Sequence, residues 1–399
     1  MNKPVRIAYV ANVRMPTEKA HGYQIMKMCE ALADEDAEVT LFCPNRRQTN
    51  ATFAGLPDVF GYYGVRHVFS LRYLRNMDVM RAEPYIPGFL FPLFFHIHSA
   101  LWGAYALIAA RRGADIVYLR DDILIAVIAR FLGIPFVYEA HRLPAGRIGR
   151  FMMRGMKGGS AKLIGALTAH LRERLIAEFG LEVARTAVLP DGADTDMFAG
   201  TGSGATVRRV AGIPAEIPLI GYVGTFTALG YEKGVASLVR AMVSVRIAYP
   251  SALLVCVGGP TELVPRYREI ATEASIADAV RFIGHVPPPE AVKWMRACDV
   301  LVIPLPNNEF FAFHTSPMKM FEYMASGVPI VASDLPSMRE VLSVETALFA
   351  RPADEISLAE QICQTLADPE AAARRANAAR EVVKDYSWRS RARTVLSRI

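Results

Sequence analysis

Short apolar runs alternate with amphipathic segments along this 399-residue chain, and the alternation occurs twice. Short apolar runs predict strands that are buried on both faces, while the segments between them have helical periodicity. In the first half, the predicted strands are 5–10, 38–43, 116–119, 136–138 and 162–167, and the predicted helices are 23–33, 123–131 and one that Thr168 caps. Strands joined by helices in this way form parallel sheets.

The second half restarts the alternation after a Gly-rich stretch at 199–218, which is predicted to be a linker. Its predicted strands are 219–223, 252–257, 280–283, 300–305 and 329–332, and its predicted helices are 235–248, 266–274, 289–297 and 317–326. The chain is therefore predicted to be an α/β protein with two doubly wound, Rossmann-like domains, 1–198 and 199–383. Such sheets would face a central cleft lined by the carboxyl ends of their strands.

The last part of the chain, 371–399, has helical character throughout. It is longer than the second sheet needs for its cover. A helix at about 384–399 is therefore predicted to cross back to the N-terminal domain.

Composition indicates a globular protein, because hydrophobic residues make up 52% of the chain and charged residues 21%. The five cysteines are odd in number and lack CxxC spacing, which predicts buried thiols in a reducing compartment and no zinc site. The first apolar run is predicted to be a strand and not a signal peptide, so a cytoplasmic protein is expected.

Positive charge is concentrated in the first half of the chain. Residues 1–190 hold 24 lysines and arginines against 16 acidic residues, whereas the remainder holds 21 against 23. Eight of the basic residues lie within 142–174. Such a stretch fits an anionic membrane surface, nucleic acid or a phosphorylated substrate, and it is also compatible with a solvated face. Aromatic residues are not interleaved with it, which argues against single-stranded nucleic acid.

One apolar stretch, 87–110, is long enough to be considered for a membrane span. Prolines and histidines interrupt it, and a strand of globular type follows at 116–119. A core helix with an exposed end at Phe89–Phe95 that touches lipid is therefore favoured over a span.

A short helix between two buried strands carries the strongest indication of a ligand site. Ser316 is predicted to cap it and Pro317 to occupy its first position. Lys319 and Glu322 share one face of this helix, near its amino end. Unpaired amide groups and a carboxylate at one place suit a diphosphate and a ribose. The alternative is an ordinary surface pair of Lys319 with Glu322.

Other polar groups follow the predicted strands where ligands of such sheets bind. A cation at a helix start opposes the helix dipole unless an anion lies there, which makes Lys233 a candidate phosphate ligand. His141 is a candidate for the cleft, or else a buried histidine with satisfied hydrogen bonds. The Asp-x-Asp in 191–196 suggests a metal, but a tight Asp-Gly turn is the favoured interpretation. These strand-end groups are Gly22, Glu139 to His141, Gly224 with Thr225, Gly258 with Gly259, and Gly284 with His285.

The order and spacing of these residues resemble glycosyltransferase family 4, whose members have the GT-B fold. The matching segments are His21-Gly22, 138–141, 189–198, Gly224 with Lys233-Gly234, 280–286, 299–304, 316–334 and 386–388. The resemblance implies transfer of a sugar from a nucleotide-sugar donor, with retention of anomeric configuration. It implies no required metal and no other cofactor.

The resemblance also assigns roles to individual residues. Glu322 matches the glutamate that binds the ribose, Lys233 the lysine that holds the donor diphosphate, and His141 the histidine near the reacting sugar. Residues 284–286 would line the base. The further donor-binding residues that the resemblance implies are Gly22, Gly224, Thr225, His285, His314, Thr315, Ser316, Met318 and Lys319.

Two positions depart from the family pattern. His314 stands where a glutamate that contacts the donor sugar is usual, and Thr225 stands where an arginine is common. Loss of a cation matters because the leaving diphosphate must be stabilised. The hypothesis is that Lys319 supplies the missing charge.

The expected protein is a metal-independent, retaining glycosyltransferase that acts at the inner face of a cell membrane. Its expected partners are a nucleotide-sugar donor, a glycan or lipid-linked acceptor and an anionic membrane surface, and no nucleic acid. Front-face attack is expected, with His141 orienting the sugar. The alternatives are a sugar-nucleotide-binding regulator, a nucleotide-sugar epimerase and, least favoured because G-x-G-x-x-G is absent, an NAD-dependent enzyme.

Overall fold

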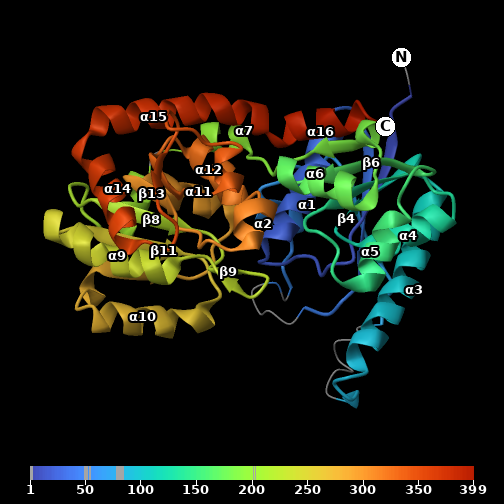
Figure 1. The fold of residues 1–399 in the computed structure, drawn as a ribbon, viewed down its shortest axis with the longest axis horizontal. Helices are drawn as coiled ribbons and strands as arrows, with labels where there is room; N and C mark the ends of the chain where they lie inside the picture. The colour runs from blue at the N-terminus through green and yellow to red at the C-terminus, as the bar shows by residue number, and fades with distance from the viewer. Residues whose placement is uncertain (1–2, 49–52, 54, 78–84, 201, 203) are drawn as a thin grey trace. The chain divides into compact units, whose positions relative to one another are not determined.

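The structure is a computed structural model that describes residues 3–48, 53, 55–77, 85–200, 202 and 204–399 (Figure 1). Contacts divide the chain into two compact units. Unit 1 comprises Met1–Pro190 and Trp388–Ile399, and unit 2 comprises Asp191–Ser387. The predicted domain boundaries at 198 and about 384 lie a few residues from these divisions.

Unit 1 contains a seven-stranded sheet in the order β3-β2-β1-β4-β5-β6-β7, and all its strand pairs are parallel. The order reverses between β1 and β4, so the carboxyl ends of these strands form a topological switch point. The strands are β1 Arg6–Val10, β2 Glu38–Pro44, β3 Ser70–Leu74, β4 Ile116–Arg120, β5 Phe136–Ala140, β6 Ala161–Ala166 and β7 Thr186–Val188. The helices are α1 Ala20–Asp34, α2 Val59–Tyr63, α3 Phe91–Arg111, α4 Ile123–Phe131, α5 Gly146–Arg154, α6 Ala169–Phe179 and α16 Trp388–Leu396.

Unit 2 contains a six-stranded parallel sheet in the order β12-β11-β8-β13-β14-β15, with its switch point between β8 and β13. The strands are β8 Leu219–Val223, β11 Leu253–Val257, β12 Val280–Ile283, β13 Val300–Ile303, β14 Ile330–Ser333 and β15 Leu348–Ala350, and a separate pair is β9 Thr227–Ala228 with β10 Tyr231–Glu232. The helices are α7 Thr195–Gly200, α8 Ala205–Val210, α9 Val235–Ala248, α10 Val264–Glu273, α11 Pro288–Ala297, α12 Met318–Ser326, α13 Pro336–Arg339, α14 Glu355–Ala367 and α15 Pro369–Val382.

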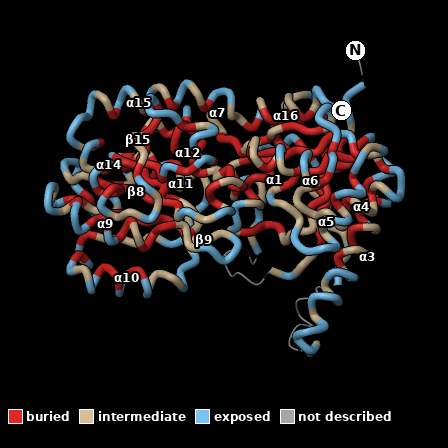
Figure 2. Tube along the Cα trace, in the orientation of Figure 1, coloured by how far each residue is buried: buried red, intermediate tan, exposed pale blue. Residues whose placement is uncertain are grey.

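Helices cover both faces of the sheet in unit 2. Val300 and Val302 of β13 pack into a cluster with residues of α9 and α14, whereas Leu301 and Ile303 pack into a second cluster with residues of α11 and α12. Successive side chains of a strand point to opposite faces, so an unbroken apolar strand needs cover on each side. The buried backbone in the interior of each unit reflects this layering (Figure 2).

The predicted α/β class and most predicted elements are confirmed. The ranges 123–131, 219–223, 235–248 and 280–283 coincide with α4, β8, α9 and β12. Strand β3 was not predicted, because this edge strand is mostly exposed and lacks a continuous apolar run. Strands β7 and β15 were missed as well, since each is only three residues long.

The predicted linker at 199–218 is wrong, because this stretch is part of unit 2 and contains helix α8. Arg208 of α8 is buried, and its guanidinium donates to the carbonyl of Ala297 at 2.6 Å and to the carboxylate of Asp299 at 2.6 Å. The same guanidinium donates to the carbonyls of Pro214, Ala215 and Ile217. One arginine therefore fixes a Gly-rich segment that has little apolar surface of its own.

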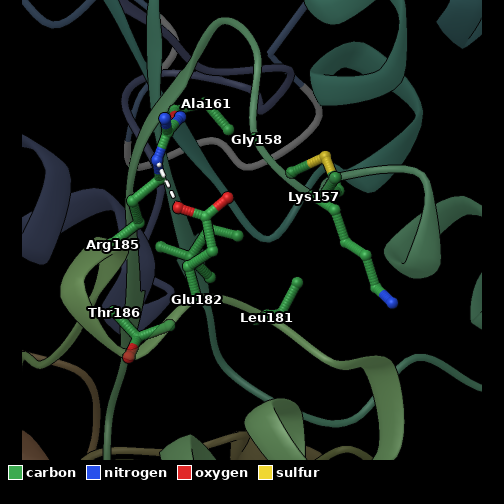
Figure 3. Close-up of a pocket in the computed structure, with 9 residues that line it drawn as sticks. Lys157, Gly158, Ala161, Leu181, Glu182, Arg185 and Thr186 are labelled. Atoms are coloured by element: carbon green, nitrogen blue, oxygen red, sulfur yellow. Dashed lines mark hydrogen bonds and ion pairs between the residues drawn. The ribbon is translucent and has the colours of Figure 1, made fainter.

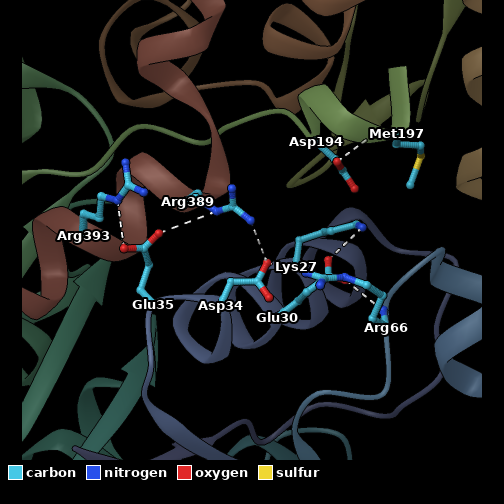
Figure 4. Close-up of polar contacts among 9 residues, drawn as sticks. All are labelled: Lys27, Glu30, Asp34, Glu35, Arg66, Asp194, Met197, Arg389 and Arg393. Carbon is cyan, nitrogen blue, oxygen red and sulfur yellow. Dashed lines mark hydrogen bonds and ion pairs between the residues drawn. The ribbon is translucent and has the colours of Figure 1, made fainter. Parts of the chain in front are cut away.

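The predicted return of the C-terminal helix is confirmed, since α16 belongs to unit 1 and packs against α1 (Figure 1). Arg391 of α16 is buried and donates to the carbonyls of Pro190 at 2.8 Å and Leu189 at 3.1 Å. On the outer side, Arg389 and Arg393 pair with acidic residues at the end of α1 (Figure 4). Exposed pairs of this kind add little stability, so the buried arginine is the principal anchor.

Helix α3 differs from the predicted core helix with one exposed end. Trp102, Ala106 and Ala110 lie in the core of unit 1, but an opposite apolar face is exposed along most of the helix. That face comprises Leu93, Phe94, Ile97, Leu101, Tyr105 and Ile108. By length and composition α3 could cross a membrane: an 18-residue window has a mean hydropathy of 1.4, and 33% of that window is buried. The burial of Trp102 and Ala106 instead fits a helix that belongs to unit 1 and also presents an apolar surface.

Replacing Arg208 by methionine should destabilise unit 2. The change removes the donor of several carbonyl groups and the ion-pair partner of Asp299, and we expect a loss of about 2–4 kcal/mol of unfolding free energy. Urea denaturation followed by fluorescence measures this loss. Arg209→Met is the matched control, because Arg209 is the exposed neighbour on the same helix. Equal effects of the two substitutions would contradict the assigned role of Arg208.

Candidate functional site

In unit 2, the chain makes a close backbone approach where β8 ends. Gly224 has φ +139°, and its amide donates to the carbonyl of Val257 at 2.8 Å. A Cβ added at Gly224 would lie 3.1 Å from Cε of Lys319. A Cβ added at Gly258 would lie only 2.2 Å from the Gly224 carbonyl oxygen. The two glycines therefore let the ends of β8 and β11 meet and leave room for the Lys319 side chain.

Lys233 lies beside these strand ends. Its Nζ donates to Oγ1 of Thr225 at 2.7 Å. Burial lowers the pKa of Lys233 to about 8. The residue that stands at the position of the family's arginine thus hydrogen-bonds the lysine that was predicted to hold a diphosphate.

The start of α9 does not need an external anion, contrary to the prediction that singled out Lys233. The anion at the start of α9 belongs to the chain itself, because the Glu232 carboxylate accepts from the amides of Gly234 at 2.9 Å, Val235 at 2.5 Å and Ala236 at 3.3 Å. The α9 dipole is therefore already compensated. Lys233 remains a candidate because of its place beside Thr225 and not because of the helix.

Helix α12 has an open amino end. Pro317 occupies the N-cap position, and no side chain caps the helix. The predicted Ser316 cap is wrong, because Pro317 separates that residue from the helix and the Ser316 hydroxyl accepts from the amide of Asp191 at 3.1 Å instead. Within the described residues, the first amides of α12, including that of Met318, receive no side-chain acceptor from a cap. This is the end of a nine-residue helix where an anion is stabilised.

Lys319 and Glu322 do not form the alternative surface pair. Lys319 is only 6% exposed, and within the described part of the chain its Nζ has no hydrogen-bond partner. Nζ lies 3.5 Å from the centroid of the Tyr222 ring, which gives a cation–π contact. Burial, and then the charge of Lys233, hold the pKa of Lys319 well below its usual value. Burial raises the pKa of Glu322 to about 7, and Asp191 adds to the rise while Lys319 opposes it.

Lys233, Lys319 and Glu322 are therefore neighbours in unit 2, because the charge of Lys319 acts on Glu322 and that of Lys233 acts on Lys319. Of the other predicted residues, His314 and Thr315 are buried just before α12, and Met318 is half-buried in its first turn. His285 is exposed at the carboxyl end of β12. Lys233 and Lys319 thus place two amines in one cluster, and the carboxylates of Glu322 and Glu232 act on Lys319.

In unit 1, His141 follows β5 and contacts two charged groups. Its Nε2 hydrogen-bonds Oε1 of Glu139, and its Nδ1 lies 3.2 Å from Nη2 of Arg120. Glu139 is fully buried and pairs with Arg391 of α16 at 3.0 Å. His141 is half-buried, and both of its ring nitrogens contact charged side chains.

Gly22 lies inside the first turn of α1 and not before it. A Cβ there would lie 2.6 Å from both Cγ2 of Thr17 and the hydroxyl of Tyr63, so a larger residue would displace the loop that precedes the helix. His21, its neighbour, has a pKa lowered to about 3 by burial and then by the charge of Arg120. Arg120 therefore lies near both His21 and His141 at the carboxyl ends of β4 and β5.

Arg120, Gln24 and Arg391 were not singled out from the sequence. Arg120 ends β4 next to the switch point, and that position could have indicated it. No local pattern indicates Arg391, because its partner is far away in sequence.

A separate small pocket lies beside the first residues of β6 and β7 and is bordered by the Glu182–Arg185 ion pair (Figure 3). None of the predicted site residues lines this pocket.

Replacing Lys319 by methionine should make unit 2 more stable at pH 7. The folded state disfavours the proton on Lys319, whereas the unfolded chain binds it up to a pH of about 10. The penalty on the wild type is therefore present at neutral pH and disappears as the pH approaches 10. Urea midpoints at both pH values measure the difference. Lys293→Met, at an exposed position of α11, should change neither midpoint, and a destabilised Lys319→Met would contradict this account.

Comparison with known proteins agrees with this architecture. The chain matches the family described as Glycosyltransferase Family 4 over residues 22–197 and the one described as Glycosyl transferases group 1 over residues 217–368. It is 26% identical over 294 residues to a glycogen synthase of Mycobacterium tuberculosis, covering 69% of this chain and 66% of that protein, which is less than two thirds of its length.

Solved structures share the fold across nearly the whole chain. A glycosyltransferase from Rickettsia africae superposes with a TM-score of 0.73 at 14% identity, covering 99% of this chain and 98% of the other. Anabaena HepE, solved with UDP and glucose, superposes with a TM-score of 0.70 at 17% identity, covering 99% and 100%. Together with two family matches that span most of the sequence, these likenesses show that the chain has the GT-B fold and belongs to glycosyltransferase family 4.

Proposed function

We propose that the protein is a retaining glycosyltransferase that moves a sugar from a nucleotide-diphosphate donor to a glycan or lipid-linked acceptor. The proposed role is the assembly of a cell-surface polysaccharide or glycolipid. The observation that carries the proposal is the grouping of Lys233, Lys319 and Glu322 beside the uncapped end of α12. Two amines and free helix amides suit a diphosphate, and a neighbouring carboxylate suits ribose hydroxyls.

In the proposed reaction, the bond between the sugar's anomeric carbon and the diphosphate oxygen breaks as the acceptor hydroxyl attacks from the same face. The proton of that hydroxyl passes to the departing diphosphate oxygen. Lys233, Lys319 and the amides of α12 would stabilise the negative charge that develops there. Because side chains would supply this charge, we propose transfer without a metal requirement. An inverted anomer in the product, observed by NMR, would contradict the retaining reaction.

The two departures from the family pattern fit this proposal. Thr225 replaces an arginine but hydrogen-bonds Lys233, and Lys319 adds a second amine in the same cluster. His314 is buried before α12 and would select the donor sugar where a glutamate is usual. The alternatives are a donor-binding regulator, which would bind without transfer, and an epimerase, which would isomerise the donor. Product analysis with and without acceptor separates all three.

Binding of the donor is the first step to test, through Glu322. The nucleotides UDP, GDP and ADP, and their sugars, should be screened by thermal shift, since a ligand of the folded state raises its melting temperature. Glu322→Gln should raise the donor KM or Kd by about 10- to 100-fold, because a charged hydrogen bond is lost. Glu360→Gln, at an exposed position of α14, is the control and should leave donor affinity unchanged.

The pH dependence provides an independent check of Glu322. Burial raises its pKa to about 7, so the carboxylate that accepts the ribose hydroxyls forms as the pH rises through this value. Wild-type donor affinity should therefore increase from pH 6 to about pH 7.5, and that increase should be absent in Glu322→Gln. An identical pH profile in both proteins would exclude Glu322 as a ribose ligand.

We further propose that unit 1 contacts an anionic membrane at the cytoplasmic face, where a lipid-linked acceptor would be available. The exposed face of α3, defined above, is the apolar part of this surface. Helix α5 lies beyond α4 on the same side of unit 1 (Figure 1), and it exposes Ile148 and Phe151, at 73% and 77%, together with Arg147 and Arg154. Apolar and basic side chains on one short helix are typical of segments that lie at a lipid surface.

Vesicle flotation tests the membrane proposal. The wild type should float with vesicles that contain anionic lipid and much less with neutral ones, since arginines near the surface each add about 1 kcal/mol. Leu93→Ser combined with Leu101→Ser should abolish flotation. Ile247→Ser should not, because this apolar residue lies on α9 of unit 2, where it is 81% exposed. If the wild type instead forms a stable dimer and ignores vesicles, the face of α3 binds a second copy and the membrane proposal is wrong.

A further inference from the structure

The carboxylate of Glu139 is the centre of a buried polar cluster in unit 1. The side chain is 0% exposed, although it belongs to the last part of β5, a strand inside the sheet. Gln24 Nε2 donates to Oε1 at 2.7 Å, and the Tyr118 hydroxyl donates to Oε2 at 2.6 Å. Arg391 pairs with Oε2 at 3.0 Å, and His141 hydrogen-bonds Oε1. Each carboxylate oxygen therefore faces two donors.

Only an ionised carboxylate satisfies this arrangement. Burial acts to raise the pKa of Glu139, but Arg391 and then His141 overcome it and hold the pKa well below the usual value. Protonation, or replacement by an amide, would place a hydrogen against one of the two donor pairs. A buried charge that loses its partner is costly, so Glu139 depends on Arg391.

The two neighbours of His141 fix its tautomer. Arginine has no acceptor, so the contact of Arg120 Nη2 with Nδ1 at 3.2 Å requires a lone pair on Nδ1. The proton of the neutral ring is then on Nε2, which donates it to Oε1 of Glu139. A second proton on Nδ1 would point at the guanidinium of Arg120. Both ring nitrogens are thus occupied by protein groups, and neither is available for proton transfer.

Helix α16 is linked to His141 through this cluster. Arg391 is 5% exposed and is held in place by the carbonyls of Leu189 and Pro190, which end the first long segment of unit 1. It is distinct from Arg389 and Arg393 of the same helix, which pair with Asp34 and Glu35 at the surface (Figure 4). The surface pairs attach the helix, whereas Arg391 places a charge beside Glu139.

We propose that Glu139 and Arg391 are positioning residues that hold His141 in a single neutral tautomer, with its proton on Nε2, so that the C-terminal helix contributes to turnover and not only to stability. The inference rests on the proposed function, in which His141 orients the reacting sugar. It assigns His141 a fixed tautomer and a fixed ring orientation. The charged groups that face the ring are Glu139, Arg120 and, through Glu139, Arg391, and His21 of α1 lies nearby.

Nitrogen NMR of the imidazole groups in the full-length, nucleotide-free protein tests the tautomer directly. We expect one His141 tautomer, protonated on Nε2, with His141→Asn used to assign its signals. In Arg391→Met and in Glu139→Gln, that signal should broaden or split into two forms. In Arg393→Gln, the matched control on the same helix, it should be unchanged. A wild-type ring protonated on Nδ1, or one that exchanges between tautomers, overturns the proposal even if no variant folds.

Kinetics separate positioning from a purely structural role. Glu139→Gln should lower kcat by about 10- to 100-fold, as expected when a group near the reaction is misplaced. The donor KM should change less than twofold, because the proposed donor residues belong to unit 2. A loss of folded protein with unchanged kcat per folded molecule would show that Glu139 is only structural. If the tautomer behaves as expected but no transfer occurs with any donor, the proposed function fails and the account of His141 remains.

Discussion

Taking charged side chains out of water is the constraint on which this structure depends, and the two units meet it in opposite ways. In unit 1, the buried Glu139 carboxylate has a full set of donors and a buried arginine, so its charge is balanced within the protein. In unit 2, buried Lys319 has an aromatic ring and no hydrogen-bond acceptor among the described residues. A balanced cluster holds its neighbours in place. A buried amine without an acceptor can instead form a strong interaction with an anion that binds beside it.

The parallel sheets explain why both clusters lie at strand ends. Strands covered on both faces leave no room for charge along their length, so polar side chains occur where β4, β5 and β8 end and the backbone turns away. Where the ends of two neighbouring strands come close together, a glycine is needed. Gly258 is an example, because a Cβ there would collide with the carbonyl of Gly224. The chemistry of the site is in this sense a consequence of the same alternation that builds the core.

That alternation is also the part that could be predicted from the sequence. Local periodicity determines α9 and β8, and it gave their bounds without error. The site was only partly predictable, because its interactions join residues that no local pattern connects. The sequence pattern at α9 suggested an external anion, but the anion is Glu232, one residue before Lys233. Arg391 has its partner in another part of the chain, and Arg208 made an apparent linker part of a folded unit.

The departure at Thr225 and the position of Lys319 are best understood together. Replacing an arginine by threonine removes a charge, and a threonine hydroxyl can still accept from the Lys233 ammonium group. A lysine on α12, one turn before Glu322, then enters the space that Gly224 leaves open, and its amine approaches Lys233. Thr225 alone would leave one amine beside the open helix end, and Lys319 adds the second. Lys319 lies over the Tyr222 ring and has no hydrogen-bond acceptor among the described residues. Its amine can therefore form a new hydrogen bond and ion pair when an anion binds.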